Sequence, residues 1–235
     1  MPQFPDNFIA ETGWLAENLG HPDLRIFDCT VFLRPPTQGR TGFSVEPGRA
    51  KWAEAHIPGS AFADIARDLS DREQGLRFML PSADQFAASM SSYGVEDGKQ
   101  VVLYDSALNM WAARVWWMLR AFGFDDARVL SGGMRKWRAE GHPIATGDTA
   151  SYPPANFVAS PRPGLMANKD EVLAAIGDGA TCIIDALGED QYEGRTRTYG
   201  RPGHIPTAGN VPAMGIIDPQ THAYLPIEAI REKTC

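Results

Sequence analysis

One local pattern occurs twice in this chain of 235 residues. In each copy a short apolar segment ends in aspartate, and the tripeptide His-Ile-Pro follows later. The two copies are Arg25-Ile26-Phe27-Asp28 with His56-Ile57-Pro58, and Cys182-Ile183-Ile184-Asp185 with His204-Ile205-Pro206. The two tripeptides lie about 150 residues apart, which is the length of a domain and too long for a solenoid repeat. We therefore expect two related domains in tandem.

The second copy is expected to be incomplete. In the first copy a further apolar strand at 101–104 ends at Asp105, which follows His56 by about 50 residues, and the ends of such strands carry the chemistry in open α/β sheets. The same spacing after His204 leads to about position 253, beyond Cys235. The sequence therefore contains this strand end for the first copy only.

Charge and hydropathy restrict the classes of partner. The chain has 22 basic and 29 acidic residues, a formal net charge of −7 and no long basic run. This balance argues against binding to nucleic acid or to an anionic membrane. No apolar run approaches the roughly 18 residues of a membrane-spanning helix, and the N-terminus lacks a signal-peptide pattern. We predict a cytoplasmic protein with no nucleic-acid and no membrane partner.

Cysteine and histidine spacing predicts neither a metal nor a cofactor. The three cysteines (Cys29, Cys182 and Cys235) are an odd number without CxxC spacing, which is typical of a reducing compartment. The five histidines are scattered and form no metal-ligand pattern.

Apolar periodicity predicts alternating strands and helices. Strands are expected at 24–27, 101–104, 127–130 and 181–184, and helices at 11–19, 111–122, 134–140, 168–176 and 226–232. Ser82 is expected to cap a helix that continues through Met90. Residues 30–50 are rich in proline, glycine and arginine and are predicted to form a loop. This order predicts an α/β fold whose mainly parallel sheets are flanked by helices.

The proline-rich stretch between residues 146 and 163 has little periodicity and predicts a linker. We therefore expect a first domain at 1–147, a linker at 148–164 and a partial second domain at 165–235.

A series of motifs, in order along nearly the whole chain, points to a known family. They are Asp28, His56-Ile57-Pro58-Gly59, Phe62 with Asp64, Met79-Leu80-Pro81, residues 102–105, Arg114-Val115-Trp116-Trp117-Met118, Gly132-Gly133-Met134 with Trp137, and Gly141-His142-Pro143. Together they resemble the two-domain rhodaneses, the thiosulfate and 3-mercaptopyruvate sulfurtransferases. The resemblance implies tandem rhodanese-like domains, of which the second is truncated here.

The resemblance also implies sulfur transfer through a cysteine persulfide. In this family the second domain carries a cysteine after its central strand, in a loop whose backbone N–H groups stabilise a thiolate. The cysteine takes sulfane sulfur from a small anionic donor and passes it to a thiophilic acceptor. Asp105 stands at the corresponding place in the first domain, which is therefore expected to be non-catalytic. We assign no catalytic residue within this chain, and we expect the chain as given to be inactive.

None of the three cysteines is expected to replace that nucleophile. Cys29 follows a strand end but has no neighbouring base in the sequence, and Cys182 lies within a strand pattern that predicts burial. Cys235 follows a helix pattern and has no glycine-rich loop around it. His56 and His204 occupy the same place in both copies, which favours a structural role for each.

Two departures from the family bear on the donor. Family members often carry arginines right after the second-domain aspartate, but residues 186–191 contain none. Arg195, Arg197 and Arg201 follow and are the candidate substrate-binding residues, and a solvated basic loop beside acidic side chains explains them equally well.

The second departure concerns a proton relay. Mercaptopyruvate-type members tend to supply an aspartate and a histidine from the first domain, and this chain has Ala66 and Phe78 at those positions. Neither side chain transfers a proton. The resemblance therefore favours thiosulfate or another donor that needs no relay.

Two functions stay open. The leading one is a sulfurtransferase whose catalytic cysteine lies beyond residue 235. The alternative is a catalytically inactive rhodanese-like binding or scaffold protein, and a cysteine loop in a longer natural chain would discriminate between them. An incomplete second domain would also expose strand edges and apolar helix faces, which favours self-association.

Overall fold

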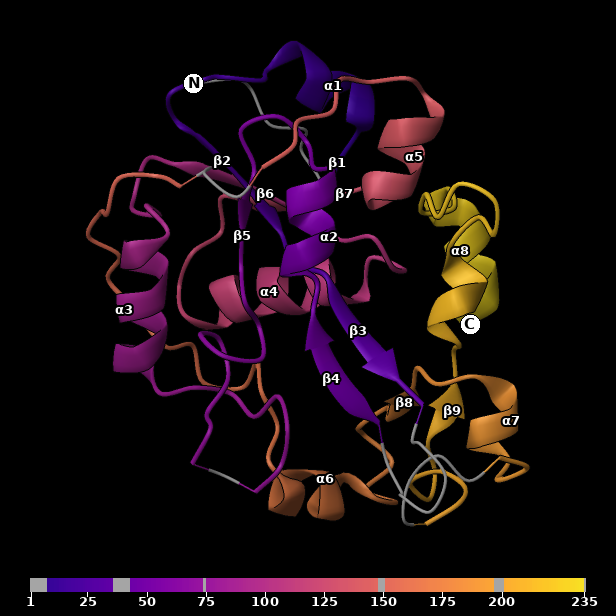
Figure 1. Ribbon diagram of the computed structural model, residues 1–235. Coiled ribbons are helices and arrows are strands. Elements are labelled where there is room, and N and C mark those ends of the chain that lie inside the picture. The colour runs from indigo at the N-terminus through magenta and orange to yellow at the C-terminus, as the bar shows by residue number, and fades with distance from the viewer. Residues whose placement is uncertain (1–7, 36–42, 74, 148–150, 197–200, 235) are drawn as a thin grey trace. The chain divides into compact units, whose positions relative to one another are not determined.

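The computed structural model describes residues 8–35, 43–73, 75–147, 151–196 and 201–234 (Figure 1). The chain divides into two compact units. The first comprises residues 1–34 and 44–163, and the second comprises residues 35–43 and 164–235. Within the described residues, no helix is long and apolar enough to cross a membrane.

A parallel sheet of five strands forms the centre of the first unit. Its order is β1 (Ile9–Ala10), β7 (Ala127–Leu130), β6 (Gln100–Tyr104), β2 (Leu24–Asp28) and β5 (Ala61–Phe62), with every neighbouring pair parallel. All residues of β2 and β6 are buried, as expected for inner strands covered on both faces. The strands predicted from apolar runs at 24–27, 101–104 and 127–130 are confirmed.

Helices flank this sheet, as the alternating pattern predicts. They are α1 (Thr12–Glu17), α2 (Arg49–Glu54), α3 (Ala83–Ser92), α4 (Met110–Ala121) and α5 (Gly133–Ala139). Figure 1 shows α1 and α5 side by side. Leu15 of α1 and Trp137 of α5 share a buried cluster with Tyr104 of β6 and Ile57. The Ser82 cap is confirmed, since the Ser82 hydroxyl accepts a hydrogen bond from the Gln85 backbone N–H at 3.2 Å.

The prediction that residues 30–50 form a loop is wrong for the part that the structure describes. β3 (Val31–Arg34) pairs antiparallel with β4 (Ser44–Pro47), and α2 begins at Arg49. Val31 is buried, and Arg34 and Glu46 form an exposed ion pair across the two strands at 2.7 Å. Residues 36–42 lie outside the described residues. The strands were missed because they are short and border a segment rich in proline, glycine and arginine.

Residues 151–163, predicted as part of a linker, contact the first unit. The Tyr152 hydroxyl accepts a hydrogen bond from the backbone N–H of Ile26 at 2.8 Å and donates one to the Gly59 carbonyl at 2.7 Å. Phe157 is 5% exposed and contacts the ring of Phe86. These contacts hold part of the proline-rich stretch in place. The domain boundaries given above stay a prediction.

The second unit has shorter elements. They are α6 (Lys169–Ala175), β8 (Ile184–Asp185), α7 (Glu189–Tyr192), β9 (Gly209–Asn210), a 3₁₀ helix at Ala213–Ile216 and α8 (Ile227–Thr234), with β8 and β9 parallel. The helices expected at 168–176 and 226–232 are confirmed.

Of the strand expected at 181–184, only Ile184 lies in β8, and the predicted burial of Cys182 is wrong. Cys182 is exposed, and so is Ile184, which stands two residues further along the chain and has a relative exposure of 55%.

Three backbone-anchored hydrogen bonds recur in the two units. The aspartate carboxylate accepts a hydrogen bond from the N–H two residues later. The aspartate carbonyl accepts one from the residue that follows the neighbouring strand. The isoleucine carbonyl of His-Ile-Pro accepts one from the N–H three residues later. In the first unit these are Thr30 to Asp28, Ala63 to Asp28 and Ser60 to Ile57, and in the second Leu187 to Asp185, Val211 to Asp185 and Ala208 to Ile205, all at 2.8–3.0 Å.

Both histidines also contact an aromatic ring and its backbone. Nδ1 of His56 lies 2.8 Å from the Trp52 carbonyl oxygen, and Nδ1 of His204 lies 2.7 Å from that of Tyr192. The imidazole of His56 also stacks on the Trp52 ring, and the imidazole of His204 stacks on the Tyr192 ring. These contacts are the kind expected of structural anchors.

Candidate functional site

Acidic side chains and a thiol lie buried at the carboxyl edge of the parallel sheet in the first unit. Asp28 ends β2, Cys29 follows it, and Asp105 follows the last residue of the neighbouring strand β6. Asp28 is 1% exposed, Cys29 0% and Asp105 2%. This is the edge at which open α/β sheets place their chemistry.

The Asp105 carboxylate occupies a cradle of backbone N–H groups at the start of α4. Oδ1 accepts hydrogen bonds from Ala107 at 2.8 Å and Asn109 at 3.1 Å, and Oδ2 accepts from Trp111 and Ala112 at 3.0 Å each. A helix N-terminus favours an anion at this place. Burial raises the pKa of Asp105, and the four N–H groups oppose that rise.

The Gly132-Gly133 pair lets the next helix approach this loop closely. Gly133 has a φ of +48°, and a Cβ there would lie 2.3 Å from the Asp105 carbonyl oxygen. That oxygen accepts a hydrogen bond from the Met134 backbone N–H at 3.1 Å. Glycine is therefore required by both its conformation and the close contact.

The buried groups beside this cradle are poorly suited to nucleophilic chemistry. Burial raises the pKa of Asp28 to about 7, with a further contribution from the charge of Asp105. Burial also raises the pKa of the Cys29 thiol well above its usual value, and the charges of Asp28 and Asp105 act in the same direction. Because the thiolate is the reactive form, Cys29 is an inert core residue.

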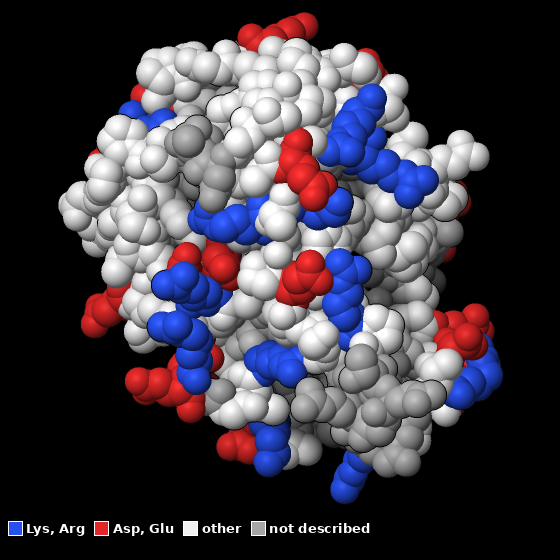
Figure 2. All heavy atoms as spheres, viewed as in Figure 1, with Lys and Arg blue, Asp and Glu red and all other residues white. Residues whose placement is uncertain are grey.

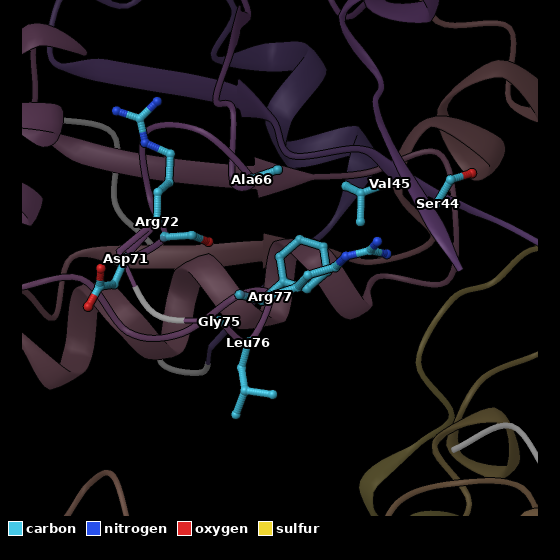
Figure 3. Close-up of a pocket in the computed structure, with 10 residues that line it drawn as sticks. Ser44, Val45, Ala66, Asp71, Arg72, Gly75, Leu76 and Arg77 are labelled. Carbon is cyan, nitrogen blue, oxygen red and sulfur yellow. The ribbon is translucent and has the colours of Figure 1, made fainter. Parts of the chain in front are cut away.

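A cavity of about 500 Å³ opens in the first unit (Figure 3). Its lining includes Ala66 and Phe78, the two positions at which the family resemblance leads us to expect a proton relay in mercaptopyruvate-type members. The other lining residues are Ser44, Val45, Ser70, Asp71, Arg72, Gly75, Leu76 and Arg77. The structure thus brings together Ala66, Phe78 and two arginines that sequence analysis did not single out. Arg72 and Arg77 lie in an exposed segment without apolar periodicity, so no structural signal for them was present in the sequence. Their position within six residues of Phe78 in the chain was the one feature that could have indicated a place at the cavity.

Phe78 is held firmly at this cavity. It adopts a φ of +60°, its carbonyl accepts a hydrogen bond from the Arg114 guanidinium, and its ring lies 4.9 Å from that of Trp111 in α4. The Asp71 N–H donates to the Met79 carbonyl at 3.0 Å, which closes the segment at its base. The cavity wall is therefore fastened to the helix that forms the Asp105 cradle.

The three arginines predicted to bind substrate have different environments. Arg195 pairs with Asp190 at 2.6 Å and also with Glu193, so acidic neighbours neutralise it. Arg197 lies outside the described residues. Arg201 lines a hollow of about 660 Å³ in the second unit, together with Asp185 and His204. Of the two arginines that the structure describes, Arg201 therefore lines a hollow and Arg195 does not.

The surface shows no broad field of one sign on the face drawn in Figure 2, where basic and acidic side chains are interspersed. Within the described ranges, no group of three or more His, Cys, Asp or Glu side chains is arranged to hold a metal ion.

Comparison with known proteins agrees with the motifs. Residues 11–140 match the rhodanese-like domain. The chain is 33% identical to thiosulfate/3-mercaptopyruvate sulfurtransferase 2 of Arabidopsis thaliana over 96% of this chain and 70% of that protein. It is 36% identical to 3-mercaptopyruvate sulfurtransferase of Rattus norvegicus over 87% of this chain and 68% of that protein.

A solved structure shows the same fold. The crystal structure of SseA from Escherichia coli, described with the rhodanese fold of 3-mercaptopyruvate sulfotransferases, superposes with a TM-score of 0.81 at 29% identity. The match covers 96% of this chain and 82% of that chain. With a matching domain that spans more than half of its length, and with curated sulfurtransferases as relatives, this chain belongs to the rhodanese family.

Proposed function

We propose that this protein is a sulfurtransferase that moves sulfane sulfur from thiosulfate or a related anionic donor to a thiophile through a cysteine persulfide. Similarity to sulfurtransferases over 87% to 96% of the chain carries the proposal. A cysteine thiolate attacks the sulfane sulfur of thiosulfate and the S–S bond breaks, which leaves a persulfide anion and releases sulfite. An acceptor such as cyanide then takes the terminal sulfur as thiocyanate and restores the thiolate.

The catalytic cysteine in this proposal lies beyond residue 235. Two observations on the described cysteines support it: Cys29 is buried with a raised thiol pKa, and Cys182 is exposed two residues before β8, away from the carboxyl end of that strand. Cys235 lies outside the described residues. The first domain is then non-catalytic, because the Asp105 carboxylate already fills the amide cradle.

The proposal includes two tandem rhodanese-like domains, of which the second is incomplete. The recurring hydrogen bonds at Asp28 and Asp185 support the duplication. In the first unit Tyr104 and Trp137 pack beside Ile57, whereas the corresponding Ile205 lines the 660 Å³ hollow and is 43% exposed. Uncovered apolar surface of this kind supports the proposed self-association.

The roles of individual arginines in donor binding are part of this proposal. Among the candidate donor-binding residues, the position of Arg201 at the hollow supports a role, and the acidic partners of Arg195 favour a solvated ion-pair cluster. The cytoplasmic location also stays a prediction.

The alternative, a non-catalytic binding or scaffold protein, is favoured by one observation. The carboxylate in the amide cradle leaves that part of the first unit no room for an external anion. A scaffold needs no second cradle, whereas a sulfurtransferase needs one with a cysteine in it.

The proposal is tested by a thiosulfate:cyanide sulfurtransferase assay on the 235-residue chain, run beside Cys29→Ala, Cys182→Ala and Cys235→Ala. We expect no turnover by any of the four. Turnover that one substitution abolishes would instead place the nucleophile within these residues. The same assay on the longest natural chain that contains this sequence is expected to show activity, and its inactivity would favour the scaffold.

A further inference from the structure

A second pocket of the first unit, of about 360 Å³, lies beside the start of β2. Leu24, Arg25 and Ile26 of β2 line it, and we call it the Arg25 pocket. β5 pairs only with the last two residues of β2, so that strand does not cover the first three. The pocket therefore lies toward the amino edge of the parallel sheet, away from the carboxyl edge that holds Asp105. Its volume is within the roughly 300–1,000 Å³ typical of small-molecule sites.

One wall of the Arg25 pocket is fastened to the rest of the unit. Tyr152 and Pro153 form this wall, and the Tyr152 hydroxyl is hydrogen-bonded to the Ile26 N–H and to the Gly59 carbonyl. Gly94 packs behind it with a φ of +73°, and a Cβ there would lie 2.6 Å from the Pro153 carbonyl oxygen. A wall that is already ordered avoids much of the entropy cost of binding.

The guanidinium group of Arg25 is nearly buried at this pocket. Arg25 is 9% exposed, and its guanidinium lies over the Tyr152 ring, 4.6 Å from the centroid. Nε donates a hydrogen bond to the Gly94 carbonyl at 2.8 Å, and Nη1 donates to the carbonyls of Pro22 at 2.9 Å and Leu24 at 3.1 Å. Nη2 makes no hydrogen bond to the residues that the structure describes.

The charge of Arg25 has no counter-charge among the described residues. Backbone carbonyls and an aromatic ring stabilise a cation, but they leave its net charge in place. Asp23, two positions earlier in the chain, forms an ion pair with Lys99 at 2.8 Å instead, and the described lining of the pocket contains no aspartate or glutamate. Because buried charges are normally paired, an anion in the pocket would complete the environment of Arg25.

His21 brings a second donor to the same pocket. Its Nδ1 accepts a hydrogen bond from the Asp23 backbone N–H at 3.2 Å, so the neutral ring carries its hydrogen on Nε2. The rings of Pro22, Pro58 and Pro153 contribute apolar lining. The pocket thus combines two polar donors with a mostly apolar wall, the combination that small organic ligands require.

From these observations we infer that the Arg25 pocket binds a small organic monocarboxylate. Its acid group accepts hydrogen bonds from Nη2 of Arg25 and Nε2 of His21, and its apolar body contacts the proline rings. A single free guanidinium nitrogen matches a single negative charge. The inference goes beyond the proposed function, because none of these residues has a part in the sulfur transfer proposed above.

Calorimetric titration of the full 235-residue chain with benzoate tests the inference. Benzamide has the same shape without the charge, and acetate has the acid group without the ring. We expect saturable binding of benzoate in the millimolar range or tighter, and binding of benzamide and acetate at least about tenfold weaker. Benzoate is also expected to slow amide hydrogen exchange at Ile26, whose N–H is bonded to the pocket wall.

Variants then locate the site. Arg25→Gln removes the buried charge and is expected to weaken benzoate binding about tenfold or more. His21→Asp keeps an acceptor for the Asp23 N–H and places a carboxylate at the pocket, where it competes with benzoate for the donors. We expect a similar loss from this substitution at a partly exposed position, which decides the question if Arg25→Gln does not fold.

Arg67→Gln is the matched control, because Arg67 is exposed and does not line the Arg25 pocket. It removes one positive charge from the first unit and should leave the affinity for benzoate unchanged. Circular dichroism of each variant checks that it is folded.

The outcomes separate this inference from the proposed function. Absence of saturable binding, equal affinities for benzoate and benzamide, or full affinity in His21→Asp and in folded Arg25→Gln would overturn it. None of these results bears on sulfur transfer by a longer chain, and an inactive longer chain would leave the carboxylate site in place.

Discussion

The two His-Ile-Pro segments have matching local hydrogen bonds but opposite exposure. In the first unit His56 is 3% and Ile57 0% exposed, whereas in the second unit His204 is exposed and Ile205 is 43% exposed. The same contrast holds for the preceding strands, since β2 is buried throughout and Ile184 of β8 is 55% exposed. The difference shows that the local motif forms its turn and strand pair from nearby residues, while its burial depends on what packs over it.

In the first unit, part of the cover over Ile57 comes from later in the chain. Tyr104 of β6, Met134 and Trp137 of α5 pack in one cluster with Ile57. The Tyr104 hydroxyl also accepts a hydrogen bond from the Ile57 backbone N–H at 3.3 Å and lies 2.9 Å from the Ser60 hydroxyl. Long-range contacts of this kind convert a local turn into a core element.

The largest expected difference comes from truncating the paired isoleucines. Ile57→Ala should lower the free energy of unfolding of the first unit by about 2–5 kcal/mol, because it leaves a cavity in a packed core. Ile205→Ala should cost less than about 1 kcal/mol, since its side chain is already partly in solvent.

All six tryptophans lie in the first unit, so urea unfolding followed by tryptophan fluorescence measures the effect of Ile57→Ala. Amide hydrogen exchange at Ala208 and Gly209 measures the effect of Ile205→Ala. Similar losses for the two substitutions would show that the two cores are equally packed.

The next difference concerns the paired aspartates and pH. The pKa of Asp28 is about 7 in the folded protein, against a usual value of 3.8. The folded state therefore holds this proton more tightly than the unfolded state, and Asp28 lowers stability progressively as pH rises from about 4 to about 7. Asp28→Asn should remove this loss and stabilise the first unit by about 2–4 kcal/mol at pH 8, with little effect near pH 4.

Urea unfolding by tryptophan fluorescence, measured from pH 4 to pH 8, checks this prediction. Asp185→Asn is the matched substitution and should leave the tryptophan transition unchanged, because Asp185 belongs to the second unit. An identical pH slope in wild type and Asp28→Asn would contradict the assignment of this titration to Asp28.

The smallest expected difference comes from the paired histidines. His56→Ala removes a buried ring that stacks on Trp52 and a hydrogen bond to the Trp52 carbonyl, and should cost about 1–3 kcal/mol. His204→Ala removes the same two contacts from an exposed position and should cost less than about 1 kcal/mol.

Hydrogen exchange of the amides around each histidine resolves the two effects. A larger loss for His204→Ala than for His56→Ala would mean that the second unit is covered in solution, for instance by self-association.

Much of the fold was predictable because its inner strands are continuous apolar runs and its helices have a clear 3.6-residue period. α4 has buried residues at 111, 112, 115, 118 and 119, and the sequence predicts this helix to within one residue at each end. The β3–β4 hairpin was missed because its short strands border a segment rich in turn-forming residues. The burial of Cys182 was mispredicted because an apolar run indicates a strand but does not say whether another element covers it.

At the candidate site, the sequence alone determined that Asp105 follows the apolar strand at 101–104 and that positions 66 and 78 hold alanine and phenylalanine, which cannot transfer a proton. Only the tertiary structure decided that four N–H groups enclose Asp105, and that Arg72, Arg77, Ala66 and Phe78 line one cavity. The reason is physical: residue identity and local periodicity are properties of short segments. The direction of an N–H group and the shape of a cavity depend on loops whose conformation is set by contacts with residues far away in the chain.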